Sequence, residues 1–241
     1  TQRSVTNFGN NSTHGVIITN EGVVLIDSGA SYLGAQEIHQ TIQTLTDKPI
    51  KIVINTGGQD HRWLGNEYFQ KLGARIVAST KAQADQKARA DYHLTRLGGL
   101  IKQSLEGTNP VVATEVFETQ KNIKLGDVKL ELYYFGSAHT AGDIFIYMPS
   151  EQIMFTGDIV FNDRMLGIGP ARNSQSWVNV FDKMANFKPK HIVPGHGHVS
   201  DLPTATKNTQ SYLKFLIHEV VKILDFDGDM LQASKIDQSD F

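Results

Sequence analysis

The sequence predicts an α/β protein in which two β/α layers pack sheet against sheet. Two observations support this fold class. Apolar runs of strand length alternate with segments of helical periodicity, and the two halves of the chain have a similar order of elements. Because no linker, sequence repeat or low-complexity tract divides the halves, we expect residues 1–241 to form one domain, long enough to bury a substantial core.

The first half begins with a predicted hairpin. Its strands, Val16–Ile18 and Val23–Ile26, flank a turn that contains Asn and Gly, which tolerate the positive φ of a tight turn. The segment Ser31–Leu45 carries apolar residues at the spacing of an amphipathic helix. Strands at Ile52–Ile54 and Ile76–Ala78 complete a β-α-β-α-β order.

The second half begins with a long predicted helix over Lys81–Leu105, which is rich in residues of high helix propensity, with a break at Gly98–Gly99. Short strands then return at Val128–Tyr134, Ile144–Tyr147, Ile153–Phe155 and His191–Val193. A helix capped by Ser174 precedes the last strand, and an amphipathic helix over Thr204–Leu224 follows it.

Composition excludes several functional classes. With 23 Lys and Arg against 25 Asp and Glu, the chain has no bulk field that favours nucleic acid or an anionic membrane. No apolar run is long enough to span a bilayer. Cysteine is absent, which excludes disulfides, zinc-thiolate sites and a cysteine nucleophile, so any metal must be held by His, Asp or Glu.

The stretch INTGGQDHRWLGN, residues 54–66, is the centre of the predicted site. An apolar strand ends there, turns through two glycines and presents Asp60 and His61 before a helix starts. Aspartate and imidazole both bind hard or borderline divalent metals. The pair alone is weak evidence, because Asp is common in turns and a lone His more often bonds within its loop.

Three later residues repeat this arrangement. His139, Asp158 and His196 each follow an apolar strand, in a turn that contains glycine. In α/β folds the strand ends meet along one edge, where ligands bind, and glycine lets the backbone approach an ion closely. A simple turn explains any one of these segments, but their recurrence predicts a shared metal site.

These segments resemble the motifs of the metallo-β-lactamase superfamily. In chain order the matching segments are LIDSG at 25–29, DHRWLG at 60–65, AHTAG at 138–142, FTGD at 155–158 and PGHG at 194–197. The resemblance implies a four-layer αβ/βα sandwich with a metal site at one edge of the paired sheets. It also implies hydrolysis of a small-molecule ester, thioester or lactam by metal-bound hydroxide.

The chain departs from the family motif at its first two histidines. Thr56 and Gly58 stand in their places, and neither can replace an imidazole, since glycine has no side chain and a neutral hydroxyl is a weak ligand. The first metal site therefore keeps only His139 and a share of Asp158. A standard two-metal centre is not expected.

The second metal site, by contrast, is complete. The resemblance implies that its ligands are Asp60, His61, Asp158 and His196, which leave a position for water. Zinc is the expected ion, although iron or manganese also suits this donor set. Asp60 or His139 would aid proton transfer from the metal-bound water.

Two alternatives to a one-ion hydrolase stay open. One is a non-catalytic metal-binding member that binds a small molecule or a protein partner; the other is an enzyme that recruits a second ion only with substrate. Residues 55–66 are similar to zinc metallohydrolases associated with bacterial sulfur oxidation and quinoproteins, which are usually exported. That resemblance implies a periplasmic protein, with a cytoplasmic location still open, and the start at Thr1 leads us to expect a processed chain. The sequence does not indicate the oligomeric state.

Other polar residues lie near the metal loops. Asp27 either supports the loop at residues 54–66 or caps the end of its own strand. Four further residues could bind an anionic substrate, although a solvated surface position is the stronger expectation for each: Arg62, Asn162, Arg164 and Arg172.

Overall fold

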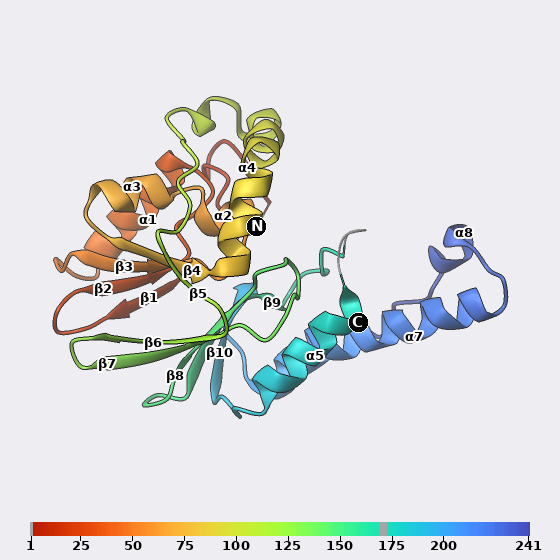
Figure 1. Ribbon diagram of the computed structural model, residues 1–241. Coiled ribbons are helices and arrows are strands. Elements are labelled where there is room, and N and C mark those ends of the chain that lie inside the picture. The colour runs from red at the N-terminus through yellow and green to blue at the C-terminus, as the bar shows by residue number, and fades with distance from the viewer. Residues whose placement is uncertain (1, 169–172) are drawn as a thin grey trace.

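Two five-stranded sheets stand face to face in the computed structural model, which describes residues 2–168 and 173–241 (Figure 1). Helices cover the outer face of each sheet. The chain therefore forms the four-layer αβ/βα sandwich that the sequence predicts.

The first sheet has the strand order β1-β2-β3-β4-β5. Its strands are β1 (Gly15–Ile18), β2 (Val23–Ile26), β3 (Ile50–Ile54), β4 (Arg75–Ser79) and β5 (Glu115–Phe117). β1 and β2 form the predicted antiparallel hairpin, and the other neighbours pair in parallel. Parallel pairing needs crossover connections, which the helices of the first half supply.

The second sheet has the order β10-β9-β8-β7-β6. Its strands are β6 (Gln120–Leu125), β7 (Val128–Tyr133), β8 (Phe145–Met148), β9 (Ile153–Phe161) and β10 (His191–His196). Only β9 and β10 pair in parallel. β9 and β10 therefore both carry their carboxyl ends, and the motif residues on them, toward the same edge.

The helices fall into two groups. Four cover the first sheet: α1 (Tyr32–Gln43), α2 (Asp60–Trp63), α3 (Asn66–Lys71) and α4 (Thr80–Ile101), which a 3₁₀ turn extends. The second group comprises α5 (Ser174–Ala185), α6 (Leu202–Ala205), a π-helical segment (Thr206–Ser211), α7 (Tyr212–Asp225) and α8 (Met230–Ala233). Of these, α5 and the beginning of α7 pack on the second sheet.

Strand alternation sorts the core into layers. In β2, Val24 and Ile26 join the apolar cluster between the two sheets, whereas Val23 and Leu25 join the cluster beneath α1 and α3. All four residues are buried, which explains why this strand reads as a continuous apolar run rather than an alternating one.

Three predicted boundaries are wrong. α4 runs unbroken through Gly98–Gly99 to Ile101, because a glycine costs a helix only about 1 kcal/mol and the neighbouring Leu97 and Ile101 are buried. β9 does not end at Phe155 but continues past Asp158, with its register shifting against β10. The cap of α5 is Asn173, whose side chain accepts a hydrogen bond from Ser176 N–H at 2.9 Å.

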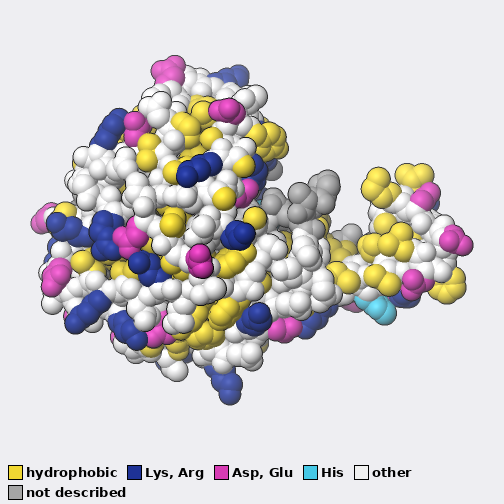
Figure 2. Space-filling model, in the orientation of Figure 1, with side chains coloured by type: hydrophobic (Ala, Val, Ile, Leu, Met, Phe, Trp, Pro, Cys, Tyr) yellow, Lys and Arg dark blue, Asp and Glu magenta, His cyan; other side chains and the backbone are white. Residues whose placement is uncertain are grey.

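The predicted last helix is present, but it leaves the body of the protein. α7 and α8 project away from the second sheet (Figures 1 and 2). Exposed apolar side chains gather on this projection: Val221, Leu224, Phe226, Met230 and Leu231. None of the helices in the described ranges has the length and apolar character needed to cross a membrane.

Candidate metal centre

Three predicted ligands meet at one edge of the paired sheets. His61 lies in α2 just after β3, Asp158 lies within β9, and His196 is the last residue of β10. All three are buried, and their ligand atoms lie within 4.8 Å of one another. In the described part of the chain, no other His, Asp and Glu residues form such a group.

The two imidazoles face one carboxylate. His61 Nε2 lies 3.2 Å from Asp158 Oδ2, and His196 Nε2 lies 3.1 Å from Asp158 Oδ1. The imidazole ring centroids are 5.1 Å apart. His196 Nδ1 lies 3.0 Å from the carbonyl oxygen of Asn11, and a proton on Nδ1 would leave Nε2 free to act as a ligand.

Arg62 holds Asp158 in place. Its Nη2 donates to Asp158 Oδ1 at 2.5 Å and its Nε to Oδ2 at 3.3 Å, while Nη1 donates to Asp27 Oδ2 at 2.8 Å. The backbone carbonyls of Thr13 and Gly195 accept its remaining two N–H groups, so all five guanidinium donors are used. The expectation of a solvated position for Arg62 is wrong: its exposed fraction is 0%.

A sequence signal for this role did exist. Asp27 and Asp158 both follow or interrupt apolar strands, and two carboxylates in such positions need a cation nearby. Arg62 is the basic residue within the central motif, beside His61. The spacing along the chain hides the contact, since Arg62 and Asp158 are 96 residues apart.

The charges in this cluster are matched to their burial. Burial alone would raise the pKa of Asp158, but the charge of Arg62, with contacts from His61 and His196, holds that pKa well below its usual range. Burial lowers the pKa of His196 to about 4 against the opposing pull of Asp158. Asp158 is thus ionised and His196 neutral near pH 7, the forms that bind a metal.

Asp27 supports the loop that carries the motif. Its backbone has a φ of 67°, and its carboxylate accepts bonds from Thr56 N–H at 2.7 Å and from Thr56 Oγ1 at 2.8 Å. The same carboxylate pairs with Arg62. These contacts favour loop support over simple capping of its own strand.

A family model described as the metallo-beta-lactamase superfamily matches residues 9–196, more than half of the chain. The chain belongs to the metallo-β-lactamase superfamily. Membership implies metal-ion binding and places the chain in a superfamily of metal-dependent hydrolases. The narrower resemblance to the sulfur-oxidation and quinoprotein subgroup stays a prediction.

Individual metallo-β-lactamases are similar to much of the chain. The type 2 enzyme of Elizabethkingia meningoseptica is 25% identical over 203 residues, which cover 80% of this chain and 71% of that protein. The type 2 enzyme of Bacillus cereus is 26% identical over 192 residues, covering 77% and 67%.

Solved structures agree with this assignment. The fold is similar to that of a metallo-β-lactamase from Pontibacter korlensis, with a TM-score of 0.68, 26% identity and coverage of 83% of this chain and 85% of that one. TMB-1 has the same TM-score at 19% identity, covering 84% and 85%, and so supports the fold alone.

The two positions where the superfamily motif has its first histidines are filled in other ways. Thr56 commits its hydroxyl to Asp27. At Gly58 a Cβ atom would lie 2.1 Å from Asp85 Oδ2, and Asp85 is itself bonded to Arg89. A side chain at position 58 therefore has no room unless Asp85 moves.

The remaining candidates lie outside the three-ligand group. Asp60 is buried, but Arg3 binds its carboxylate. His139 packs with its ring centroid 5.3 Å from that of Phe161, whose ring in turn lies 4.8 Å from that of His196. His139 therefore borders the centre across one aromatic side chain.

Three further expectations concerned substrate-binding residues. Asn162 is buried rather than solvated, and its amide donates to Ser200 Oγ at 2.9 Å, which braces the chain after β10. Arg164 is exposed as expected, with Nη1 3.1 Å from His196 Nδ1. Arg172 lies outside the described residues.

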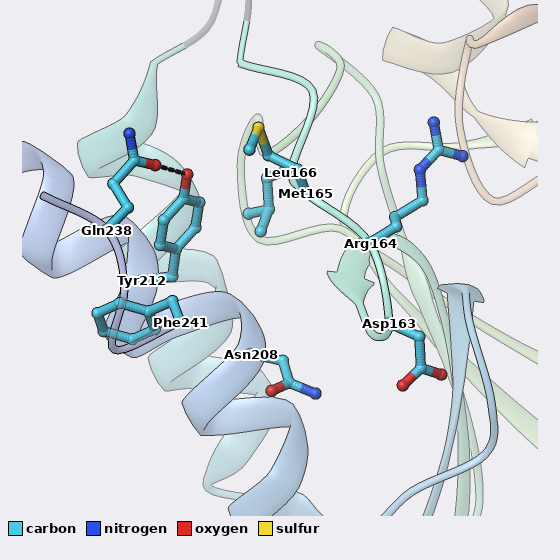
Figure 3. A pocket seen from close by; sticks show the side chains of 8 residues that line it. All are labelled: Asp163, Arg164, Met165, Leu166, Asn208, Tyr212, Gln238 and Phe241. Carbon is cyan, nitrogen blue, oxygen red and sulfur yellow. Dashed lines mark hydrogen bonds between the residues drawn. The ribbon is translucent and has the colours of Figure 1, made fainter. Parts of the chain in front are cut away.

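A cavity of about 450 Å³ adjoins the segment that carries Arg164 (Figure 3). Its lining residues are Asp163, Arg164, Met165, Leu166, Asn208, Tyr212, Gln238 and Phe241. Tyr212 Oη donates to Gln238 Oε1 at 2.5 Å across one side of it. None of the three ligand residues lines this cavity, and Arg164, whose Nη1 lies 3.1 Å from His196 Nδ1, links it to the surroundings of the centre.

Proposed function

We propose that this protein is a hydrolase that uses one divalent metal ion, held by His61, Asp158 and His196, to cleave a small-molecule ester, thioester or lactam. The observation that carries the proposal is the convergence of two imidazoles on one buried, ionised carboxylate. Superfamily membership supports hydrolysis as the reaction class.

The donor set fits a divalent cation. Two nitrogens and one carboxylate leave coordination positions for water and substrate, as catalytic zinc sites do. His61 Nε2 is buried and makes no well-aligned hydrogen bond within the described residues. Such an atom costs about 1–3 kcal/mol, which a metal bond would remove. Zinc is our first choice, and iron or manganese would also accept these ligands.

A bound divalent cation would supply the chemistry by lowering the pKa of water and polarising the bond under attack. The residues of this chain have supporting roles. Arg62 fixes the Asp158 carboxylate, and Asp27 fixes both Arg62 and the loop at Thr56. This preorganisation keeps the ligand atoms in place before substrate arrives.

Proton transfer is assigned to His139 rather than Asp60. The His139 ring packs against Phe161, which in turn contacts His196, and an imidazole can exchange protons near neutral pH. Burial alone would raise the pKa of Asp60, but hydrogen bonds from His61 and Arg3 hold it well below its usual range. A carboxylate that is so weakly basic is a poor proton acceptor.

A non-catalytic metal-binding protein is the second candidate. The filling of positions 56 and 58 favours it, because the protein has lost half of a hydrolytic centre. An enzyme that takes up a second ion with its substrate is a third possibility. In that enzyme the second ion would need a further ligand besides His139. Either Asp85 would have to leave the space at Gly58 or another residue would have to supply the ligand.

Metal content tests the proposal directly. Protein purified without chelator, or loaded with zinc, iron or manganese, should contain one ion per chain by elemental mass spectrometry. His196→Ala should lose the ion, with at least about tenfold weaker binding, because a ligand and its neutral imidazole are gone. His198→Ala is the matched control: this imidazole lies two residues along, is 95% exposed and pairs with the exposed Asp163.

The loaded protein would then be assayed on esters, thioesters and lactams. Hydrolysis that disappears in His196→Ala and persists in His198→Ala would support the proposal. One ion without hydrolysis of any substrate would favour the non-catalytic candidate. Two ions per chain without substrate, or none after loading, would contradict the one-ion centre.

A further inference from the structure

The carboxylate of Asp60 has no acceptor position left for a metal ion. Arg3 binds both of its oxygens through its two terminal nitrogens. The backbone N–H of His61 donates to Asp60 Oδ1 at 2.8 Å, and Arg96 Nη1 lies 3.4 Å from Oδ2. Since a carboxylate offers about four lone-pair sites, these four donors saturate it.

Asp158 differs in the point that matters for ligation. Arg62 takes one position on each of its oxygens, at 2.5 Å and 3.3 Å. The other side of each oxygen faces an imidazole nitrogen, His61 Nε2 at 3.2 Å or His196 Nε2 at 3.1 Å. Asp158 can therefore give lone pairs to an ion between the imidazoles, whereas Asp60 cannot do so while Arg3 is bound.

Arg3 also acts on His61. Its Nη2 lies 2.8 Å from His61 Nδ1, and Asp60 Oδ1 lies 3.1 Å from the same nitrogen. A histidine that binds metal through one nitrogen normally donates its other N–H to an acceptor such as a carboxylate. Asp60 Oδ1 is that acceptor for His61, and Arg3 Nη2 binds the same oxygen, so Arg3 competes with His61 Nδ1 for it.

The fold holds Arg3 at this position. The segment that follows it is tied to three parts of the first layer: Ser104 Oγ donates to Val5 O at 2.9 Å, Ser31 Oγ to Phe8 O at 2.7 Å, and Asn10 Nδ2 to Gly34 O at 3.0 Å. The Arg3 side chain is 9% exposed. Its guanidinium is thus a built part of the centre.

We propose that Arg3 sets the metal affinity of the centre by competing with the ion for the Asp60–His61 pair. While Arg3 is bound, Asp60 is excluded from the coordination sphere and the ion is held by His61, Asp158 and His196. Arg3 is a positioning residue: it acts through the two side chains that it binds. This inference rests on the metal site of the proposed function.

The test compares zinc affinity in the full chain, by competition with a chromophoric chelator. Arg3→Met should bind zinc at least about tenfold more tightly than wild type, the size of effect typical of groups that contact metal ligands. Arg75→Met is the matched control for loss of a positive charge, because Arg75 lies at the amino end of β4 and pairs with Glu115. Its affinity should equal that of wild type.

A second substitution tests whether the higher zinc affinity of Arg3→Met comes from Asp60. Asp60→Asn keeps a side-chain oxygen that can accept from His61 Nδ1, so it should change zinc affinity less than about threefold in wild type, where Asp60 is not a ligand. It should abolish the gain in Arg3→Met. With cobalt(II) as the probe, the visible absorption spectrum of Arg3→Met should differ from that of wild type, because a carboxylate oxygen joins the ion. Asp60→Asn in the Arg3→Met background should restore the wild-type spectrum.

Each alternative result has a definite meaning. Equal zinc affinity in wild type and Arg3→Met would overturn the inference and leave the one-ion hydrolase intact. Loss of zinc from Asp60→Asn alone would also overturn it, by showing that Asp60 is a ligand despite Arg3. No zinc binding by either protein would overturn both this inference and the proposed function.

Discussion

His61, Asp158 and His196 turn their ligand atoms toward one another, whereas positions 56 and 58, on the loop just before His61, offer none. Both regions belong to the same edge of the sandwich. In the first, the Arg62 guanidinium binds the Asp158 carboxylate, and both carboxylate oxygens still face the imidazoles of His61 and His196. In the second, the space of a missing imidazole is filled by Asp85, which Arg89 binds.

The contrast shows that ligand count depends on what occupies the surrounding space as well as on the motif. A histidine placed at position 58 would meet a carboxylate and not an empty site. The group of His61, Asp158 and His196 depends equally on its surroundings, since the negative charge of the buried Asp158 would be uncompensated without Arg62.

The largest effect is expected at Arg62. Arg62→Met keeps most of the side-chain volume but leaves Asp27 and Asp158 buried without their shared cation, which should cost about 3–5 kcal/mol of unfolding free energy. Urea unfolding of the metal-free protein would measure the loss. Arg75→Met, at a half-exposed ion pair, should cost less than about 1 kcal/mol.

A loss below about 1 kcal/mol in Arg62→Met would mean that the two carboxylates find other partners or take up protons. Arg62 would then not be needed to hold Asp158 beside His61 and His196. Arg62→Lys gives an intermediate test. A lysine keeps the charge but cannot span both carboxylates with a planar fork, so we expect a smaller loss than with methionine.

A smaller effect is expected at Gly58. Gly58→His should cost about 1–3 kcal/mol, because its Cβ would lie 2.1 Å from Asp85 Oδ2 and would push that carboxylate away from Arg89. It should not bring a second ion. In Gly58→His combined with Asp85→Ala, most of the lost stability should return, as urea unfolding of the four proteins of this cycle would show.

If Gly58→His is as stable as wild type, the space at position 58 is not filled as the structure indicates. If it binds a second zinc ion without the Asp85 substitution, Asp85 is no obstacle to a two-metal centre. Either result would remove the contrast between the two regions.

The parts of the site that the sequence predicted are local in origin. Strand periodicity predicted the fold class. The Asp and His residues in glycine-containing turns, together with the family resemblance, gave a predicted ligand set of four residues, three of which converge in the structure. The parts that it missed depend on contacts between distant segments. Arg3 reaches Asp60 across 57 residues, and the cation at Arg62 serves carboxylates 35 and 96 residues away.

Asp85 is a second example of a contact that the sequence does not predict. It lies within a helical run of polar and small residues, a pattern that predicts an amphipathic surface helix and nothing about position 58. Only the packing of α4 against the motif loop brings its carboxylate there. A motif can thus predict which ligands are present, but the filling of a vacated position depends on tertiary packing.

The smallest effect concerns a buried imidazole outside the centre. His93, on α4, is 1% exposed and neither ring nitrogen has a hydrogen-bond partner among the described residues, in contrast to His196 beside its carboxylate. Burial lowers the pKa of His93 from 6.5 to about 4. The unfolded chain therefore protonates this imidazole at a higher pH than the folded chain does. The contribution of His93 to the free energy of unfolding is fully present above pH 6.5 and is lost as the pH falls from 6.5 toward 4.

His93→Leu should remove that share of the acid sensitivity. Between about pH 7 and about pH 5.5, wild type should lose about 1 kcal/mol more unfolding free energy than the variant. Urea unfolding at several pH values would measure the difference, and His191→Leu, an exposed imidazole, is the control that should keep the wild-type slope. Equal slopes in His93→Leu and wild type would show that His93 is hydrated or partnered in solution. His14 and His196, whose pKa values burial also lowers to about 4, would then be candidates for the acid sensitivity.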